Sequence, residues 1–92
     1  MALRLESARP NPFRGQAEFS YGLPHGGRVR LDVYDVRGRR VASVVDRVDI
    51  AGWGSVVWDG RDTAGREVGS GTYFVRLQSG GETQVRKVVL AR

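Results

Sequence analysis

Three carboxylates lie close together in the sequence WDGRDTAGREVGSGTYF, which spans residues 58–74. Asp59, Asp62 and Glu67 are the residue types that bind hard cations such as calcium. A loop of the EF-hand kind requires a bidentate glutamate at its twelfth position, but counting from Asp59 places Ser70 there and Asp62 at the fourth position. The stretch therefore lacks that motif, and it leaves open only an irregular cation site near Asp59 and Asp62.

The same stretch is rich in glycine, at Gly60, Gly65, Gly69 and Gly71. A phosphate-binding P-loop needs Gly-Lys-Ser/Thr at the start of a helix, and this sequence contains no such run. A turn accounts for more of the residues, because glycine permits positive φ and aspartate side chains accept hydrogen bonds from nearby backbone amides. The run DTAG at 62–65 suits a type I turn. We predict a folded connection between two core strands, secured by a tyrosine corner at Tyr73.

Catalytic chemistry has little support in the rest of the chain. His25 is the single histidine, and it lies between Pro24 and Gly26 in a predicted turn, where its side chain is expected to face solvent. No serine lies on a recognisable nucleophile elbow, and cysteine is absent. We expect a domain that is not an enzyme and that uses no cofactor.

The apolar residues recur mostly with a period of two, which predicts β-strands and no helix. In four strands the alternation defines the inward face: Ala17, Phe19, Tyr21, Leu23; Val29, Leu31, Val33; Val56, Trp58; Tyr73, Val75, Leu77. Arg28, Arg30 and Asp32 are predicted to face water. The pattern is irregular at 41–50, which predicts a bend or bulge, and residues 85–90 have valines on both faces, so their inward face stays open.

Turn signals separate these strands at short intervals. They are His25 to Gly27, Gly38, Gly52 and the pair Gly80 and Gly81. With the run LRLESA near the start, the chain has about seven short strands, at a spacing typical of a β-sandwich. We predict one all-β domain over residues 1–92, an antiparallel β-sandwich in which residues 1–9 are either a first strand or a leader.

Charge gives a weaker indication of function. The chain has 92 residues and a net charge of +5, and its 15 basic residues are fourteen arginines and Lys87. They are scattered along the sequence and not interleaved with aromatic residues, so we expect no nucleic-acid binding. No run approaches the ~18 apolar residues of a membrane-spanning helix, so we expect no membrane insertion. Absence of cysteine excludes disulfides and fits a bacterial or intracellular protein.

Several motifs resemble two related families. These are PNPF (10–13), YGLP (21–24), VRLDVYDVRGRRV (29–41), AGWGSVVWDGRDTAGREVGSGTYFVRL (51–77) and RKVVL (86–90). In this order they resemble the C-terminal type A sorting domain of bacterial type IX secretion substrates and the immunoglobulin-like domain of the flagellar hook-capping protein. The resemblance covers about residues 10–90, and it implies an immunoglobulin-like sandwich.

The resemblance also implies a function. In the sorting family such a domain is a non-catalytic C-terminal module of a larger secreted bacterial protein, recognised by the export machinery. The positions that would carry this recognition are Asn11, Pro12, Lys87, Val88, Val89 and Leu90, whereas Asp59, Gly60, Asp62, Gly65, Gly71, Trp58 and Tyr73 would form turns and core. The protein would then be secreted or on the cell surface, with export machinery or domains of its parent as partners.

Two other functions remain open. The chain can instead be a structural spacer or assembly domain, like the hook-capping relative. It can also be a carbohydrate-binding module, since exposed aromatic rings stack on sugars and Trp53, beside two glycines at a strand boundary, is expected to be exposed.

Overall fold

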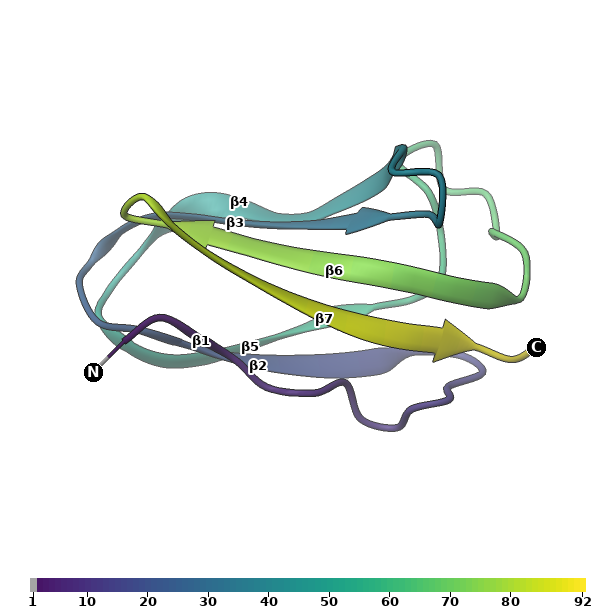
Figure 1. Cartoon of the computed structure of the whole chain (residues 1–92), viewed down its shortest axis with the longest axis horizontal. Helices are drawn as coiled ribbons and strands as arrows, with labels where there is room; N and C mark the ends of the chain where they lie inside the picture. Colours follow the sequence, from purple (N-terminus) through teal and green to yellow (C-terminus); the bar gives the residue numbers. More distant parts are fainter. Residues whose placement is uncertain (1) are drawn as a thin grey trace.

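The computed structural model describes residues 2–92 and consists of seven strands in two antiparallel sheets (Figure 1). The strands are β1 (Arg4–Leu5), β2 (Ala17–Leu23), β3 (Gly27–Tyr34), β4 (Arg40–Asp49), β5 (Gly52–Trp58), β6 (Gly71–Ser79) and β7 (Glu82–Leu90). One sheet has the order β1-β2-β5 and the other β4-β3-β6-β7. The predicted all-β sandwich is confirmed. No helix in the part described is long and apolar enough to cross a membrane.

The core lies between the two sheets and is built from the inward faces that the alternation predicts. Phe19 and Tyr21 of β2 face Leu31 of β3 and Val75 of β6 across the sandwich, and all are at most 1 % exposed. Val56 is only half-buried but packs against this core. Val88 and Leu90 of β7 are buried and Val85 is exposed, which settles the inward face of the last strand.

Two irregularities bend β4, as its sequence predicts. The pairing of β3 with β4 shifts register between Leu31 and Asp32 and again between Val33 and Tyr34. Each shift leaves one extra residue on β4, Val44 in the first case and Val41 in the second. Both valines are half-buried against the core, so the bulges keep apolar residues inward despite the broken alternation.

A five-residue turn occurs twice, at Asp35–Arg39 and at Asp62–Arg66, with the shared sequence Asp-x-x-Gly-Arg. In both, the aspartate Oδ1 accepts hydrogen bonds from the backbone amides two and four residues later, at 2.9–3.0 Å. Its carbonyl accepts the amide of the glycine, which has φ of +83° at Gly38 and +82° at Gly65. A residue with a Cβ is strained at such angles, so the glycine fixes the turn.

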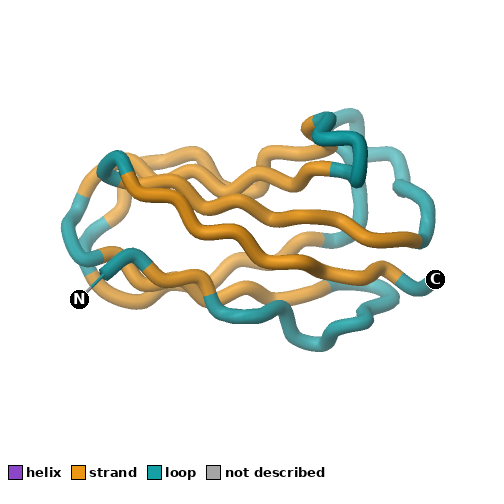
Figure 2. The backbone as a smooth tube through the Cα atoms, viewed as in Figure 1, coloured by secondary structure: helices purple, strands orange, loops and turns teal. Residues whose placement is uncertain are grey.

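The N-terminal segment contacts both sheets. Figure 2 shows it as a short strand followed by a long loop. Its first part bonds to β2, through Glu6 to Ser20 and through a reciprocal pair between Arg9 and Glu18. Phe13 then forms a parallel bridge with Leu90 of β7. Arg4–Leu5 is therefore the outer strand of the three-stranded sheet, and Arg9 adds a bridge to Glu18. Met1 lies outside the described residues.

One prediction of exposure to water is wrong. Asp32 is 2 % exposed, although alternation places it on the outer face of β3. Its neighbours cover it: Ser43 and Arg76 lie opposite on the adjacent strands, and the Arg30 guanidinium donates a 2.8 Å hydrogen bond to its Oδ2. In the middle strands of a sheet, long side chains from both neighbours can bury a short one without any second layer of backbone.

Candidate functional site

The residues that the resemblance assigns to partner recognition come together at one edge of the four-stranded sheet. β7 is the last strand of this sheet, so half of its backbone groups point away from β6. The Val89 amide donates to the Asn11 side-chain oxygen at 2.9 Å, and the Asn11 side-chain amide donates to the Lys87 carbonyl at 3.4 Å. One carboxamide thus occupies two outward backbone groups of β7.

We call residues 11–13 the cap of β7, because they cover its outward edge. The backbone of Phe13 also bonds to this edge. Its amide donates to the Val89 carbonyl at 2.9 Å, and its carbonyl accepts the Ala91 amide at 2.8 Å. The Phe13 ring is 1 % exposed and anchors the segment in the core, where it packs 5.5 Å from Trp58. The segment 11–13 therefore covers the C-terminal half of the β7 edge and is held there from both its backbone and its side chains.

The six candidate recognition residues divide into two groups. Val88 and Leu90 are at most 1 % exposed and belong to the core, so they cannot be touched by a partner without unfolding. Asn11, Pro12 and Lys87 are exposed and Val89 is half-buried. Lys87 lies opposite Phe74 of β6, on the outer face of the sheet. The accessible part of the site is therefore the cap and the outer face of β7.

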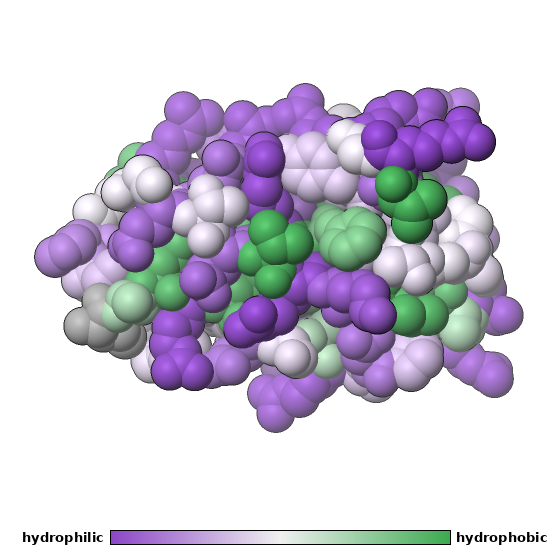
Figure 3. All heavy atoms as spheres, viewed as in Figure 1, coloured by the Kyte–Doolittle hydropathy of each residue, from purple (hydrophilic) through white to green (hydrophobic). Residues whose placement is uncertain are grey.

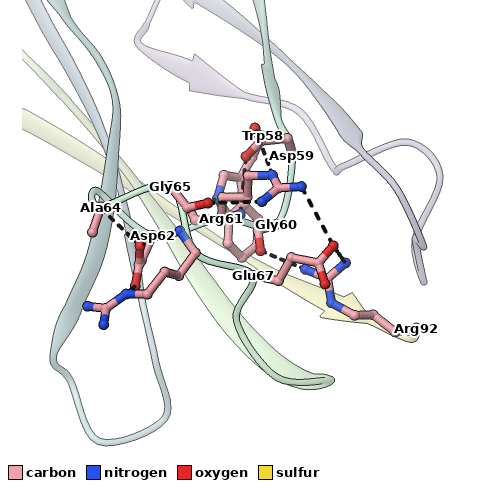
Figure 4. A network of polar contacts seen from close by, with 10 residues as sticks. Trp58, Asp59, Gly60, Arg61, Asp62, Ala64, Gly65, Glu67 and Arg92 are labelled. Atoms are coloured by element: carbon pink, nitrogen blue, oxygen red, sulfur yellow. Dashed lines mark hydrogen bonds and ion pairs between the residues drawn. The ribbon is translucent and has the colours of Figure 1, made fainter.

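The connection between β5 and β6 forms a compact polar network (Figure 4). Trp58 is 2 % exposed, and its indole N–H donates to the Arg61 carbonyl at 2.9 Å. Asp59 accepts the Arg61 amide at 3.1 Å, and the Arg61 guanidinium donates to the Gly65 carbonyl at 2.9 Å. The predicted turn and core roles of Trp58, Asp59 and Asp62 agree with this geometry.

Arg92 fastens the same connection from the end of the chain. Its guanidinium donates to the carbonyls of Gly60 at 2.7 Å and Val68 at 3.1 Å, and lies 3.8 Å from the Glu67 carboxylate. Gly60 has φ of +73°, and a Cβ there would lie 2.8 Å from the Arg92 guanidinium. Gly60 is thus required for its backbone angle, and a Cβ there would also move the Arg92 guanidinium from its present position.

A hard cation has no prepared site in this connection. The Asp62 side chain accepts two backbone amides and lies 3.6 Å from the Arg66 guanidinium, while Glu67 lies beside Arg61 and Arg92. Across residues 2–92, no three His, Asp or Glu side chains are grouped closely enough to hold a metal ion. The carboxylates bond to arginines and backbone amides, and a cation would have to displace these partners.

Tyr73 forms the predicted corner. Its hydroxyl donates to the Gly69 carbonyl at 2.6 Å, and its ring packs edge-on against Trp58 with centroids 5.3 Å apart. Burial raises the pKa of the Tyr73 hydroxyl above its ordinary value. Gly71 begins β6 two residues earlier, opposite Leu90. Trp58, Phe13 and Tyr73 therefore form one aromatic cluster beneath the connection.

A second buried tyrosine closes the opposite end of the sandwich. The Tyr21 hydroxyl donates to Asp49 at 2.8 Å and accepts a 2.9 Å hydrogen bond from Arg47. Burial, reinforced by the hydrogen bond to Asp49, raises the pKa of Tyr21, and the same hydrogen bond lowers the pKa of Asp49. These three groups lie away from the edge formed by Asn11 and β7, and we assign them a structural role.

The two remaining candidates lie where the sequence places them. His25 is exposed in the turn between β2 and β3. Trp53 is 58 % exposed on the outer face of the three-stranded sheet, and its ring lies flat over Gly22, where a Cβ would come within 3.3 Å of it. A shallow hollow beside it is lined by Ser20, Gly54 and Ser55. The predicted exposure of Trp53 is confirmed, and sugar binding stays a prediction.

Sequence reasoning missed Phe13 and Arg92 as parts of this site. Phe13 stands in the quoted run PNPF, and its apolar ring after two prolines was the available signal for an anchor. The sequence contains no indication for Arg92, because nothing in the type or position of a single arginine shows which residues it contacts. The residues that Phe13 and Arg92 contact lie far from them along the chain.

Comparison with known proteins places the chain among immunoglobulin-like domains. Of solved structures, it is similar to PorU from Porphyromonas gingivalis, crystallised as a latent dimer (24 % identity, TM-score 0.72, covering 90 % of this chain and 9 % of that one). It is also similar to FlgD from P. aeruginosa (30 %, TM-score 0.64, 82 % and 60 %). A third is PorZ, an essential surface component of the type IX secretion system of P. gingivalis (19 %, TM-score 0.57, 99 % and 12 %).

The chain thus spans a small part of PorU and PorZ, and the likeness to these two concerns the fold. No curated protein sequence matches it significantly. A family model, described as the FlgD Ig-like domain, matches residues 8–82, which include the cap, all of β2 to β6 and the whole connection after Trp58. This chain therefore belongs to the FlgD Ig-like domain family.

Proposed function

We propose that the chain is a non-catalytic, protein-binding module of a larger exported bacterial protein. In this proposal the edge formed by Asn11, Pro12 and β7 is the sorting signal that type IX secretion machinery recognises. The observation that carries it is the pair of hydrogen bonds that join Asn11, the neighbour of Pro12, to Lys87 and Val89 of β7. Residues far apart in the chain thereby form one surface that exists only in the folded domain.

The fold comparisons support the same proposal. PorZ is described as a surface component of type IX secretion, and a domain of this fold occurs within it and within PorU. The matched stretch is about a tenth of each of these chains, which supports a module of a larger protein. The secreted or cell-surface location of the parent protein, and its export machinery as partner, follow from this proposal.

The experiment is export of a reporter. Residues 2–92 are fused to the C-terminus of a periplasmic reporter in a bacterium that has the type IX pathway, and the reporter is measured at the surface and in the periplasm. Surface display is expected for the natural sequence. Lys87→Ala removes an exposed side chain of the proposed signal and should reduce display, whereas Arg14→Ala removes an exposed cation outside it and should not. Retention of the unmodified fusion in the periplasm contradicts the proposal.

Family membership favours a second candidate, an assembly or spacer domain that packs against its parent or neighbouring subunits. Under this candidate, deleting the domain lowers the stability or assembly of the parent protein and leaves its export unchanged. The two candidates therefore differ in which of these two measurements responds.

The exposed Trp53 ring favours a third candidate, glycan binding. Stacking of a sugar on the ring would change the tryptophan fluorescence when the domain is mixed with members of a polysaccharide panel. The buried Trp58 gives a constant background, and Trp53→Ala should abolish the change. A flat response of the natural domain across the panel contradicts this candidate.

A further inference from the structure

An apolar hollow lies on the outer face of the four-stranded sheet, on the side away from the core. It is lined by Tyr34, Asp35 and Val36 from the end of β3 and the turn that follows, by Phe74 and Arg76 from β6, and by Val85 from β7. Val36 is 69 % exposed, Val85 48 % and Phe74 37 %. Figure 3 shows apolar side chains gathered over the middle of this face, with hydrophilic ones around them.

Apolar and cationic side chains alternate across this face. Phe74 lies directly opposite Lys87, and Arg76 lies directly opposite Val85, so that each apolar residue is flanked by a cation. Tyr34 lies opposite Phe74 on the other side, with the Arg76 guanidinium 4.8 Å above its ring and bonded to its hydroxyl at 2.7 Å. The tyrosine thus holds Arg76 in one position beside the hollow.

Two cations on this face, Arg76 and Lys87, form no ion pair, although most basic side chains of the described residues do. Among the described residues, nine of the fifteen basic side chains form ion pairs, and six do not: Arg14, Arg37, Arg40, Arg76, Arg86 and Lys87. Two of the six, Arg76 and Lys87, flank the hollow, whereas Arg86 lies opposite the buried Val75 and belongs to the other face of β7. The carboxylates nearest the hollow are Asp35 in its lining and Asp32 opposite Arg76, and they are paired with Arg39 and Arg30, so no ion pair offsets the charge of Arg76 and Lys87.

We propose that this face binds an acidic segment of a partner protein that carries one large apolar side chain. The apolar side chain would fill the hollow between Phe74 and Val85, and carboxylates on either side of it would meet Lys87 and Arg76. Charge complementarity selects this occupant, because a basic segment would be repelled and a purely apolar one would leave both cations desolvated without partners. The proposal rests on the proposed function, since it specifies the surface and the chemistry by which a protein-binding module meets its partner.

The probe is a fluorescent synthetic peptide, Asp-Glu-Asp-Phe-Asp-Glu-Asp, titrated with the domain and followed by fluorescence anisotropy. Lys87→Glu and Phe74→Ala are each expected to weaken binding about tenfold, as loss of one central contact does at a small interface. Arg14→Glu makes the same charge change at an exposed cation outside the face, and Trp53→Ala removes an exposed ring from the other sheet. Both control variants are expected to bind as the natural domain does.

Two further peptides separate the two parts of the proposal. Replacing the phenylalanine by glycine should weaken binding about as much as Phe74→Ala, and replacing all acidic residues by lysine should abolish it. Binding that Arg14→Glu weakens as strongly as Lys87→Glu, or that does not depend on the phenylalanine, reflects net charge alone and overturns the proposal. Absence of binding also overturns it. If the natural fusion still displays its reporter at the surface, only this inference fails and the proposed function stands. Circular dichroism of each variant confirms that the fold is intact.

Discussion

Asn11 and Val89 are 78 positions apart in the chain, and a hydrogen bond of 2.9 Å from the Val89 amide to the Asn11 side-chain oxygen joins them. The same side chain donates to the Lys87 carbonyl. One asparagine therefore satisfies two backbone groups of β7 that a neighbouring strand would otherwise bond. An edge strand with unpaired groups is prone to pair with other chains, and the cap protects the C-terminal half of β7 from this. The N-terminal segment and the last strand are therefore one structural unit.

Asn11→Ala should loosen this unit without unfolding the domain. Both hydrogen bonds are at the surface, so their loss should lower the free energy of unfolding by about 1 kcal/mol, measured by urea denaturation. The Val89 amide should also exchange its hydrogen faster, which amide exchange detects residue by residue. Arg14→Ala, in an exposed residue with no ion pair among those described, is the matched control. An unchanged exchange rate at Val89 would show that the cap does not hold in solution.

Trp58→Ala should abolish folding. The indole is 2 % exposed, packs against Phe13 and Tyr73, and donates to the Arg61 carbonyl. Truncating such a side chain costs about 3–5 kcal/mol, which approaches the whole stability of a small domain. Trp58→Phe keeps part of the packing and loses the hydrogen bond, so its effect should be smaller. Thermal unfolding followed by circular dichroism measures both, and an unchanged melting temperature for Trp58→Ala would contradict the assigned core.

Gly60→Ala and Gly69→Ala form a matched pair in the same connection. Gly60 has φ of +73° and no room for a Cβ beside Arg92, whereas Gly69 has open space around it and no left-handed backbone angle. Gly60→Ala should destabilise by about 1–3 kcal/mol, and Gly69→Ala should be neutral or stabilise by up to about 1 kcal/mol. Equal effects in urea denaturation would contradict the left-handed backbone angle assigned to Gly60.

Stability should fall in alkaline solution because of Tyr21 and Tyr73. Burial raises the pKa of both hydroxyls in the folded state, so the unfolded chain loses these protons at a lower pH than the folded one. The contribution is fully present below about pH 10, the ordinary tyrosine value, and is lost as the pH rises through the raised pKa. Urea denaturation over this range measures it, with tyrosinate absorbance to follow ionisation. The Tyr21→Phe, Tyr73→Phe double variant should show a flatter profile; an equally steep one would assign the loss to other groups.

Period-two alternation was sufficient to predict most of the fold, because a sandwich has one dry and one wet face on each strand. It placed Phe19, Leu31, Trp58 and Val75 correctly, and the broken pattern in β4 correctly predicted its bulges. It failed at Asp32, because alternation identifies the face of a strand and not what covers that face. Arg30 and Arg76 bury Asp32 from strand positions that would themselves be expected to lie in water.

The candidate site could be predicted only in part. Turn chemistry is local, so the roles of Asp62, Gly65 and Tyr73 follow from their own sequence neighbourhood. The cap on β7 and the Arg92 contacts join residues far apart in the chain, and no spacing rule reports such contacts. The resemblance named Asn11 and Lys87 together, but only the structure shows that they meet. The hollow beside Phe74 likewise depends on three strands brought together by the fold.

Surface display of the reporter fusion decides whether the capped edge of β7 is a sorting signal. The fusion of residues 2–92 should place most of the reporter on the cell surface, and Asn11→Ala combined with Lys87→Ala should return it to the periplasm while the purified domain still melts cooperatively. Equal display of the natural and the doubly substituted fusions, with the reporter intact in both, would contradict the role assigned to this edge.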